Sequence, residues 1–381
     1  VLIRLTNSKN KNVFLLFKVL IEKLLYSCDG INKVYVLMRD NRNASISYRA
    51  FQVFSRLQKE KPWCSCALRT HLGTIKLLLR NWPGFNETVI VTGVGVIIII
   101  FQVSYVFHLG ATVNFNDPVE LMFDINVGGT ERVMNLCKRM KRLQKFVYVS
   151  TAFSNSNHQV IEERIYPLPF TLNAIKKQIL GENKECKSTL SDGRPNTYTF
   201  TKAIAEVYIN DNRAHVPSVI VRPSIVVASL KEPVEGWIDT WSGANSVVWG
   251  IGLGLTRALR GKYSNATDFI PVDYVINLTI VAATTDSHCS DEVAVYNSSS
   301  SELNPIILRM VNEYVVGHSI KNKLSASWVI RAQRTKALFL SLSQKDRDEF
   351  PFNPENIDWE NFMYTYCSGI REHLLKTKSK S

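Results

Sequence analysis

The sequence lacks three features that would assign it directly to a class: a cysteine framework, an internal repeat and a basic tract interleaved with aromatic residues. Its 7 cysteines are odd in number and scattered, so they predict thiols in a reducing compartment rather than disulfides. Cys64 and Cys66, with His71 nearby, resemble half of a zinc site, but no second pair of ligands completes it. We therefore expect no metal site.

Acidic residues are fewer than basic ones. Lys and Arg total 46 against 33 for Asp and Glu, which gives a net charge of +13 and a sequence pI near 9.3. This excess suits phosphate-bearing cofactors, coenzyme A, anionic membrane surfaces or nucleic acid, and it does not choose among them. Because no basic tract carries interleaved aromatic residues, we expect no nucleic-acid partner.

The first 17 residues lack the layout of a secretory signal, since no charged segment is followed by an apolar one. Segment 88–110 is long and apolar enough to span a bilayer of ~30 Å. It is rich in β-branched residues, however, and includes Gln102 and His108. We predict a buried strand there, with a membrane helix as the alternative.

The chain does contain an alternation of apolar strands and helices. Residues 18–25 have helical spacing of apolar residues, and Asp117–Pro118 predicts a helix start because Asp caps helices and Pro fits their first turn. The alternation favours an α/β fold with a doubly wound parallel sheet of the Rossmann type. Beyond residue 297 the pattern is mostly helical, so we expect two domains, 1–297 and 298–381. The predicted strands are 34–38, 103–108, 146–149 and 218–222.

The strongest chemical signal is Tyr198 followed by Lys202, one helical turn apart. An ammonium beside a phenol favours the phenolate, so we expect Lys202 to lower the pKa of Tyr198 below its ordinary ~10. The phenol would then donate a proton to a carbonyl oxygen near neutral pH. A hydroxyl, Thr151 or the neighbouring Ser150, follows the apolar run 146–149 at the end of a predicted strand.

A strand-end hydroxyl with Tyr-x-x-x-Lys resembles the short-chain dehydrogenase/reductase enzymes. From Val106 onward the chain resembles one of their extended families, the alcohol-forming fatty acyl-CoA reductases. Of the shared elements, Gly-Trp-Ile-Asp and Ile-Pro-Val-Asp are more specific than Tyr-x-x-x-Lys. The matching segments are 106–108, 111–113, 126–130, 198–202, 222–226, 232–239, 268–273, 346–350, 358–359 and 369–371.

The resemblance implies a role for each matched position. Tyr198 would protonate the carbonyl oxygen, Lys202 would assist it and hold the nicotinamide ribose, and Thr151 would hydrogen-bond the carbonyl. Asn126 would serve a proton relay or the helix itself. The implied NADPH contacts are Arg39, His108, Ala111, Lys202, Arg222 and Pro223, and the implied substrate contacts are Gly236, Trp237 and Asp239. For Arg39 a solvated strand end is the alternative to a 2′-phosphate contact, and for His108 a core histidine is the alternative to a ligand.

Two departures from the family pattern concern the N-terminal and C-terminal thirds. Segment 5–17 stands where such reductases carry a glycine-rich turn, and it holds no glycine, so it cannot readily let the backbone approach a pyrophosphate. Segment 62–84 shows neither the strand nor the acidic residue expected near an adenine, and the C-terminal domain is short between about residues 299 and 338. A fragment, a faulty gene model and an inactive homologue all remain open.

The resemblance implies NADPH-dependent reduction of long-chain fatty acyl-CoA to fatty alcohol. An impaired homologue that binds acyl-CoA or a partner is one alternative, and a reductase of a sterol or sugar nucleotide is another. It also implies association with a membrane surface, on the cytosolic face of the endoplasmic reticulum or a peroxisome. Acyl chain length and oligomeric state are not readable from the sequence.

Overall fold

The fold is that of a computed structural model, which describes most of the chain. The described residues are 1–4, 12–28, 31, 34–37, 75–78, 100–115, 117–180, 192–241, 243–256, 264–285, 292–316 and 329–375.

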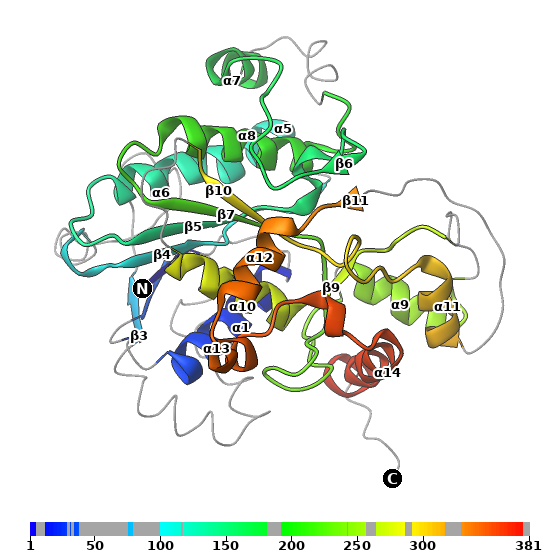
Figure 1. Cartoon of the computed structure of the whole chain (residues 1–381). Coiled ribbons are helices and arrows are strands. Elements are labelled where there is room, and N and C mark those ends of the chain that lie inside the picture. The colour runs from blue at the N-terminus through cyan, green and yellow to red at the C-terminus, as the bar shows by residue number, and fades with distance from the viewer. Residues whose placement is uncertain are drawn as a thin grey trace. The chain divides into compact units, whose positions relative to one another are not determined.

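A seven-stranded sheet forms the centre of the fold, with strand order β10-β7-β5-β4-β1-β2-β3 (Figure 1). All pairings from β7 to β3 are parallel. From β1 the chain adds β2 and β3 on one side, and it then adds β4, β5 and β7 on the other. The strands are β1 (Leu2–Arg4), β2 (Val34–Leu37), β3 (Ile75–Leu78), β4 (Tyr105–His108), β5 (Lys145–Val149), β7 (Ser218–Pro223) and β10 (Ala294–Ser298).

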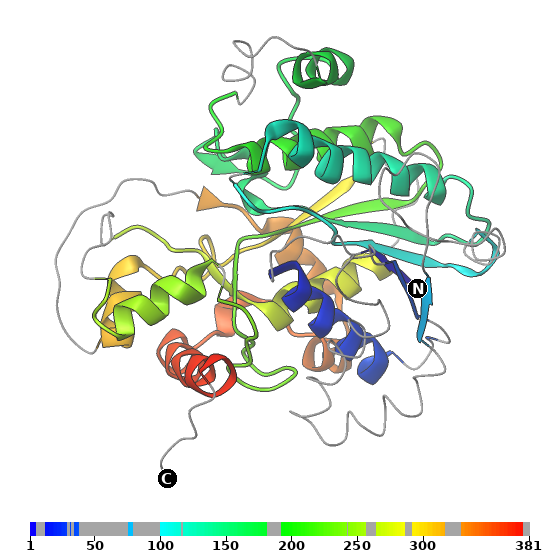
Figure 2. The ribbon, with the colours of Figure 1, turned by 180° about the vertical axis from the view of Figure 1, so that it is seen from behind.

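Helices lie on both faces of this sheet, so it is doubly wound. Helix α1 (Asn12–Ser27) lies on one face, while α5 (Val119–Phe123), α6 (Gly129–Cys137) and α8 (Thr197–Asn212) lie on the other, as the two opposite views show (Figures 1 and 2). Because both faces are covered, the central strands are mostly apolar on both sides rather than alternating between apolar and polar residues. All five residues of β5 are buried.

The core on the α6 and α8 face explains why these segments pack together. Phe146 and Tyr148 alternate along β5 and therefore point to the same face of the sheet. They meet the apolar sides of α6 and α8 in one buried cluster. Its members from the two helices include Val133, Met134, Cys137, Ala205 and Ile209, each less than 3% exposed.

The predicted strands 34–38, 103–108, 146–149 and 218–222 are confirmed within one or two residues at each end. The predicted helix 18–25 is part of the longer α1. The prediction that Asp117 caps the next helix is wrong, because α5 begins at Val119 after Pro118 without a side-chain cap. Asp117 instead accepts hydrogen bonds from the Thr112 hydroxyl at 2.7 Å and the Asn114 amide at 2.6 Å.

Two expectations for the N-terminal third are tested only in part. Segment 62–84 does contain a strand, β3, which pairs in parallel with β2, so the prediction that it lacks one is wrong. Of segment 88–110, residues 105–108 form β4, and residues 88–99 lie outside the described part of the chain. Among the described helices, none has both the length and the apolar character to cross a membrane.

The chain divides into two compact units whose boundaries do not follow the chain order. The first comprises residues 1–157, 164–221 and 282–295, and the second comprises 158–163, 222–281 and 296–381. The domain boundary at residues 297 and 298 stays a prediction. Elements in or at the edge of the second unit are β6 (Val160–Ile161), β8 (Ile225–Val227), α9 (Ala244–Gly252), β9 (Phe269–Pro271), α10 (Val272–Thr284), α11 (Leu308–Val316), β11 (Val329–Ile330), α12 (Gln333–Ser341), α13 (Gln344–Glu349) and α14 (Trp359–Gly369).

Buried carboxylates fix the loops of the second unit. Asp273, at the start of α10, accepts the backbone N–H groups of Leu230 and Lys231 at 2.9 Å each. Glu163 accepts from the backbone of Asn297 at 2.9 Å and from Thr335 at the start of α12. Burial raises the pKa of both carboxyl groups, although these donors oppose the rise.

Two glycines of the second unit make a close backbone contact. Gly236 has φ +69, which side-chain-bearing residues rarely adopt, and it lies against helix α14. A Cβ atom on Gly369 would lie only 1.8 Å from the carbonyl oxygen of Gly236. The turn and the helix can therefore approach this closely only because neither residue has a side chain.

We expect Gly369→Ala to lower the free energy of unfolding by about 3 kcal/mol or more, because the backbone has no room to yield. Thermal unfolding of the purified chain measures the loss. Gly252→Ala is the matched control, since its Cβ would meet Val315 at an ordinary 3.5 Å. Equal stability of the two variants would contradict the packing argument.

Candidate active site

Strand β5 ends at two adjacent hydroxyl residues, Ser150 and Thr151. The Ser150 backbone N–H still follows the sheet, donating to Val221 at 2.8 Å. Its hydroxyl donates to the Glu206 carboxylate. Thr151 begins a short 3-10 turn, Ala152–Asn155, and its hydroxyl oxygen accepts the Phe153 N–H at 3.3 Å. Ser150 therefore directs its proton into the fold, which favours Thr151 as the hydroxyl that meets a substrate carbonyl.

Helix α8 carries the tyrosine and the lysine. Asn196 caps its N-terminus by accepting the Thr199 N–H at 2.9 Å, which fixes the first turn, where Tyr198 lies. The ring of Tyr198 packs against that of Phe115, with centroids 6.0 Å apart. Lys202 follows one turn later and Glu206 one turn after that, each 1% exposed. Three chemically active side chains thus follow each other at intervals of one turn.

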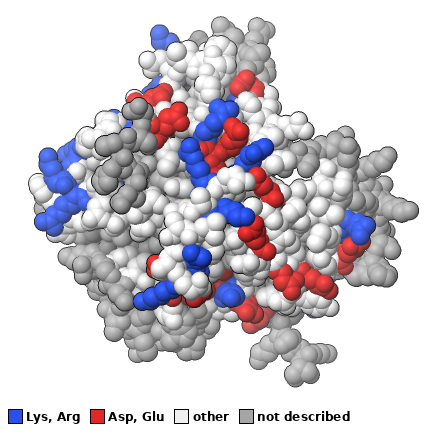
Figure 3. All heavy atoms as spheres, viewed as in Figure 1, with Lys and Arg blue, Asp and Glu red and all other residues white. Residues whose placement is uncertain are grey.

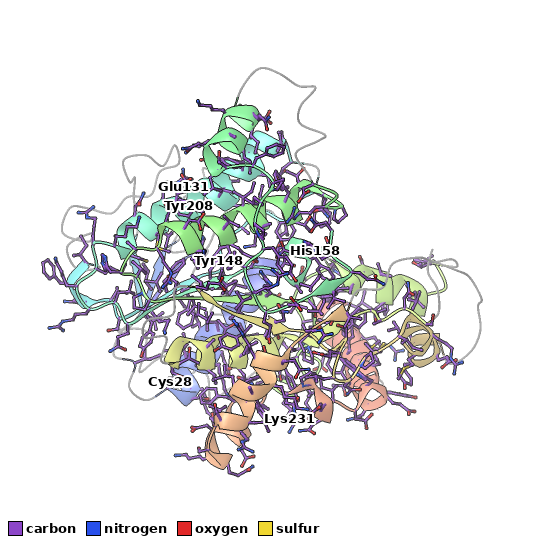
Figure 4. All side chains as sticks on the ribbon, turned by 45° about the horizontal axis from the view of Figure 1, so that its top comes forward. Cys28, Glu131, Tyr148, His158, Tyr208 and Lys231 are labelled. Carbon is purple, nitrogen blue, oxygen red and sulfur yellow. The ribbon has the colours of Figure 1, made fainter. Side chains whose placement is uncertain are left out.

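The Lys202 ammonium is held by strand β5. It donates to the Val149 carbonyl at 2.7 Å and to the Tyr148 hydroxyl at 3.0 Å, and it lies 4.3 Å from the Tyr148 ring centroid. Tyr148 is completely buried, between the strands and the helix layer (Figure 4). These contacts offset the cost of burying the charge and keep it at the carboxyl end of β5.

The pKa of Tyr198 is raised, not lowered, so the expected direction is wrong for the protein as it stands. Burial of the phenol is the main cause, and the negative charge of Glu206 adds to it. Lys202 directs two of its three N–H donors to β5, so these two do not stabilise a negative charge on the Tyr198 oxygen. Tyr198 therefore remains protonated throughout the neutral pH range and is available as a proton donor.

Asn126 lies in a π-helical turn, Asp124–Gly128, between α5 and α6. Its side-chain oxygen accepts the Thr112 N–H at 2.8 Å, and its amide donates to the Thr112 carbonyl at 3.1 Å and to the Thr201 hydroxyl at 3.0 Å. These bonds fix the loop after β4 to the helix that carries Tyr198. The geometry favours the structural alternative for Asn126, and the proton-relay role stays a prediction.

His108 is fully buried at the end of β4, opposite Tyr148 in the sheet register. Its ring lies 5.5 Å from that of Tyr148, and its Nε2 lies 3.1 Å from the Thr130 hydroxyl. These contacts agree with the interpretation as a core histidine.

No cluster of His, Cys, Asp or Glu suited to a metal ion occurs among the residues that the structure describes. Of the described cysteines, Cys28, Cys137 and Cys367 carry thiols rather than disulfides.

The loop after β4 contains Ala111 and Thr112, both buried. It leaves the sheet where β4 and β1 are neighbours, the point at which the strand order reverses. In sheets of this kind dinucleotides bind at this reversal, at the carboxyl ends of the strands. The cofactor role of Ala111 therefore stays a reasonable prediction, and Arg39 lies outside the described residues.

The remaining predicted contacts belong to the second unit. Arg222 is fully buried, and its guanidinium donates to the Glu162 carbonyl at 3.0 Å, while Pro223 ends β7. Gly236 and Trp237 are buried in the turn that packs on α14, and Asp239 is half-buried. The burial of Trp237 fits a core position, and the cofactor and substrate roles of this group are predictions that the structure does not test.

Sequence reasoning missed Glu206 and Tyr148. Glu206 repeats the four-residue spacing from Tyr198 through Lys202, so its helical face was readable. Its partners Ser150 and Ser154 were not readable, because they lie more than 50 positions away in the chain. In the sequence, Tyr148 does not stand out from the apolar residues of its strand, so its contact with Lys202 was not predicted.

The reversed parallel sheet and the tyrosine–lysine helix beside a strand-end hydroxyl define a reductase of the extended short-chain class. Two family models, both described as male sterility protein, match residues 97–279 and 305–377, the first of them an NAD-binding domain. Fatty acyl-CoA reductase 1 of Homo sapiens is 33% identical over 450 residues, covering 96% of this chain and 85% of that protein. The chain belongs to the fatty acyl-CoA reductase family, and it is an oxidoreductase.

Other similar proteins agree with this assignment. Fatty acyl-CoA reductase 1 of Xenopus laevis is 28% identical, and fatty acyl-CoA reductase 2 of Mus musculus is 26% identical, each covering 94% of this chain and 82% of its own length. Among solved structures, the terminal R domain from the myxalamid PKS-NRPS biosynthetic pathway aligns with TM-score 0.67 at 17% identity, over 100% of this chain and 92% of that one. UDP-glucuronic acid 4-epimerase from Bacillus cereus, in complex with NAD, aligns with TM-score 0.59 at 16% identity over both whole chains. At such identities these structures establish the fold alone.

Proposed function

We propose that the chain reduces long-chain fatty acyl-CoA to fatty alcohol with NADPH. The observation that carries this proposal is the placement of Tyr198 and Lys202 on α8 beside Thr151 at the end of β5. It occurs in a chain that belongs to a family of fatty acyl-CoA reductases. The overall change is acyl-CoA plus two NADPH and two protons to alcohol, coenzyme A and two NADP⁺.

The described residues fit the nicotinamide half of such a cofactor. A buried ammonium, Lys202, lies at the carboxyl end of β5, where it suits ribose hydroxyls, and the loop at Ala111 leaves the sheet at the reversal of strand order. When bound, the nicotinamide supplies hydride to the substrate carbon. The fit is weaker at the pyrophosphate, since segment 5–17 contains no glycine.

Tyr198 and Thr151 would handle the charge that develops on the substrate oxygen. Reduction of a thioester or an aldehyde turns a carbonyl oxygen into an oxyanion, which needs hydrogen-bond donors and finally a proton. Thr151 would donate a hydrogen bond, and Tyr198 would donate the proton. A phenol with a raised pKa still protonates an alkoxide readily, because the alkoxide is the stronger base. Collapse of the hemithioacetal would then release coenzyme A as the thiol.

The test is an assay of the purified chain with palmitoyl-CoA and NADPH. We expect hexadecanol by mass spectrometry and two NADPH consumed per alcohol, followed by absorbance. NADH in place of NADPH tests the choice of cofactor, and a UDP-sugar in place of palmitoyl-CoA tests the sugar-nucleotide alternative. Binding of palmitoyl-CoA without any product would favour the impaired homologue instead, for which the glycine-free segment 5–17 is the main support.

We expect the chain to bind NADPH only weakly, with affinity at least ~10-fold below that of a variant with a glycine-rich turn in place of residues 5–17. Glycine would let the backbone approach the pyrophosphate, and the helix N-terminus would then favour its charge. Calorimetric titration of both proteins measures the difference. Micromolar affinity of the unchanged chain would mean that other contacts compensate.

Association with a membrane surface, on the cytosolic face of the endoplasmic reticulum or a peroxisome, is part of the same proposal. The net charge of +13 supports it, because anionic lipids attract basic proteins. Figure 3 shows Lys and Arg mixed with Asp and Glu over much of the described surface of one face. Flotation with vesicles of 30% phosphatidylserine against neutral vesicles tests the association, and equal flotation would contradict it.

A further inference from the structure

The turn after β5 is tied at both ends to a single carboxylate. Ser150, before the turn, and Ser154, inside it, both donate their hydroxyls to the same Glu206 oxygen, Ser154 at 3.0 Å. Glu206 is 1% exposed, and both serines are buried. Thr151 lies between the two serines, and its carbonyl accepts the Ser154 N–H at 3.2 Å. Residues 150–154 therefore form a small closed loop around Thr151 that is fixed to helix α8.

Arg194, just before α8, fixes the same loop a second time. Its guanidinium donates to the Ser154 carbonyl at 2.7 Å and to the Asn155 side chain at 3.0 Å. Asp192 pairs with the guanidinium at 2.9 Å. Helix α8 thus holds the Thr151 loop from its N-terminal approach and from its third turn, and Tyr198 lies between these two attachments.

Burying a carboxylate costs free energy, because the charged group loses its hydration. An apolar side chain would pack at the same position without that loss. A carboxylate instead fixes the orientation of the hydroxyl groups that bind it, because its oxygens accept hydrogen bonds along preferred directions. Lys202 and Glu206 are one turn apart on α8, and they bind consecutive parts of the strand end, Val149 and Ser150. Together they fix the position of the helix along the end of β5.

We propose that Glu206 is a positioning residue that sets the Thr151 hydroxyl relative to the Tyr198 phenol. Glu206 acts through Ser150 and Ser154 and does not itself contact the substrate. The proposal deepens the reductase function above and rests on it for the kinetic consequence. The structural half, that Glu206 orders the loop 150–155, stands independently of any substrate.

Hydrogen–deuterium exchange of the purified chain tests the structural half. In Glu206→Ala the two serine hydroxyls lose their acceptor, so we expect the amides of residues 152–156 to exchange about 10-fold faster. Glu206→Gln keeps an acceptor oxygen and should stay within about threefold of the unchanged chain. Asp211→Ala, an exposed acidic residue on the same helix, is the matched control and should change nothing at 152–156. Unchanged exchange in Glu206→Ala would overturn the proposal.

If Glu206→Ala does not fold, the same measurement is made on Ser154→Ala. This variant removes the hydrogen bond from Ser154 to Glu206 and keeps the one from Ser150. It should raise exchange at 152–156 at least threefold. Protection equal to that of the unchanged chain would count against the proposal in the same way.

A double-mutant cycle tests the kinetic half, with palmitoyl-CoA as the substrate and NADPH varied up to saturation. We expect Glu206→Ala to lower kcat about 10²-fold with KM for NADPH changed less than about threefold, since a small misplacement of a reacting group is costly. In the Thr151→Ala background the same change should cost less than about threefold, because the hydroxyl it positions is gone. Equal losses in both backgrounds would overturn the positioning role. If the chain reduces no acyl-CoA but Glu206→Ala still speeds exchange at residues 152–156, the proposed function is refuted, while the structural role of Glu206 in the loop remains supported.

Discussion

Replacing Tyr198 by Phe is expected to lower turnover of long-chain acyl-CoA by about 10²–10⁴-fold, while NADPH affinity stays within about twofold. The phenol would protonate the oxygen of the substrate, so its loss should affect the chemical step and not cofactor binding. Measurement in the variant with a glycine-rich turn keeps cofactor binding from limiting the rate.

Tyr208→Phe is the matched control for this experiment. Tyr208 lies on the same helix, beyond Glu206 in the chain. It lies near Glu131 (Figure 4), and burial together with this carboxylate raises the pKa of Tyr208 to about 12. We expect turnover close to that of the unchanged protein. Normal alcohol formation by Tyr198→Phe would overturn the role of Tyr198 as the proton donor.

Replacing Lys202 by Met should damage both turnover and cofactor binding, each by at least ~10²-fold, because one ammonium would serve the phenol and the ribose together. The variant should also be less stable by about 1–3 kcal/mol, since the buried Val149 carbonyl loses its 2.7 Å donor. Steady-state kinetics, NADPH titration and thermal unfolding measure the three effects separately.

Lys145→Met separates stability from function. Lys145 is also buried and also donates to a carbonyl, that of Thr285 at 2.6 Å, but it lies at the opposite end of β5. We expect a similar loss of stability with turnover and NADPH affinity nearly unchanged at 25 °C. If both lysine variants lose activity in proportion to stability, Lys202 has a structural role only.

The sequence identified the parallel sheet because its strands are buried on both faces. Segments such as 146–149 are then continuous apolar runs, which are recognisable without any partner. Strand β3 was missed because residues 75–78 are short and follow no helical or turn signal that would mark them. The start of α5 was misplaced by one residue because Asp117 bonds to Thr112 instead of capping the helix.

The sequence by itself determined the class of the fold and the four-residue spacing of Tyr198, Lys202 and Glu206, because apolar patterning and helix geometry are local properties. Only the tertiary structure decided where these side chains direct their charges and protons. Lys202 donates to Tyr148 and Val149, and Glu206 accepts from the loop around Thr151. The pKa of Tyr198 rises instead of falling. The physical reason is that hydrogen bonds and burial join residues far apart in the chain, and the balance of desolvation against charge is set only when they meet.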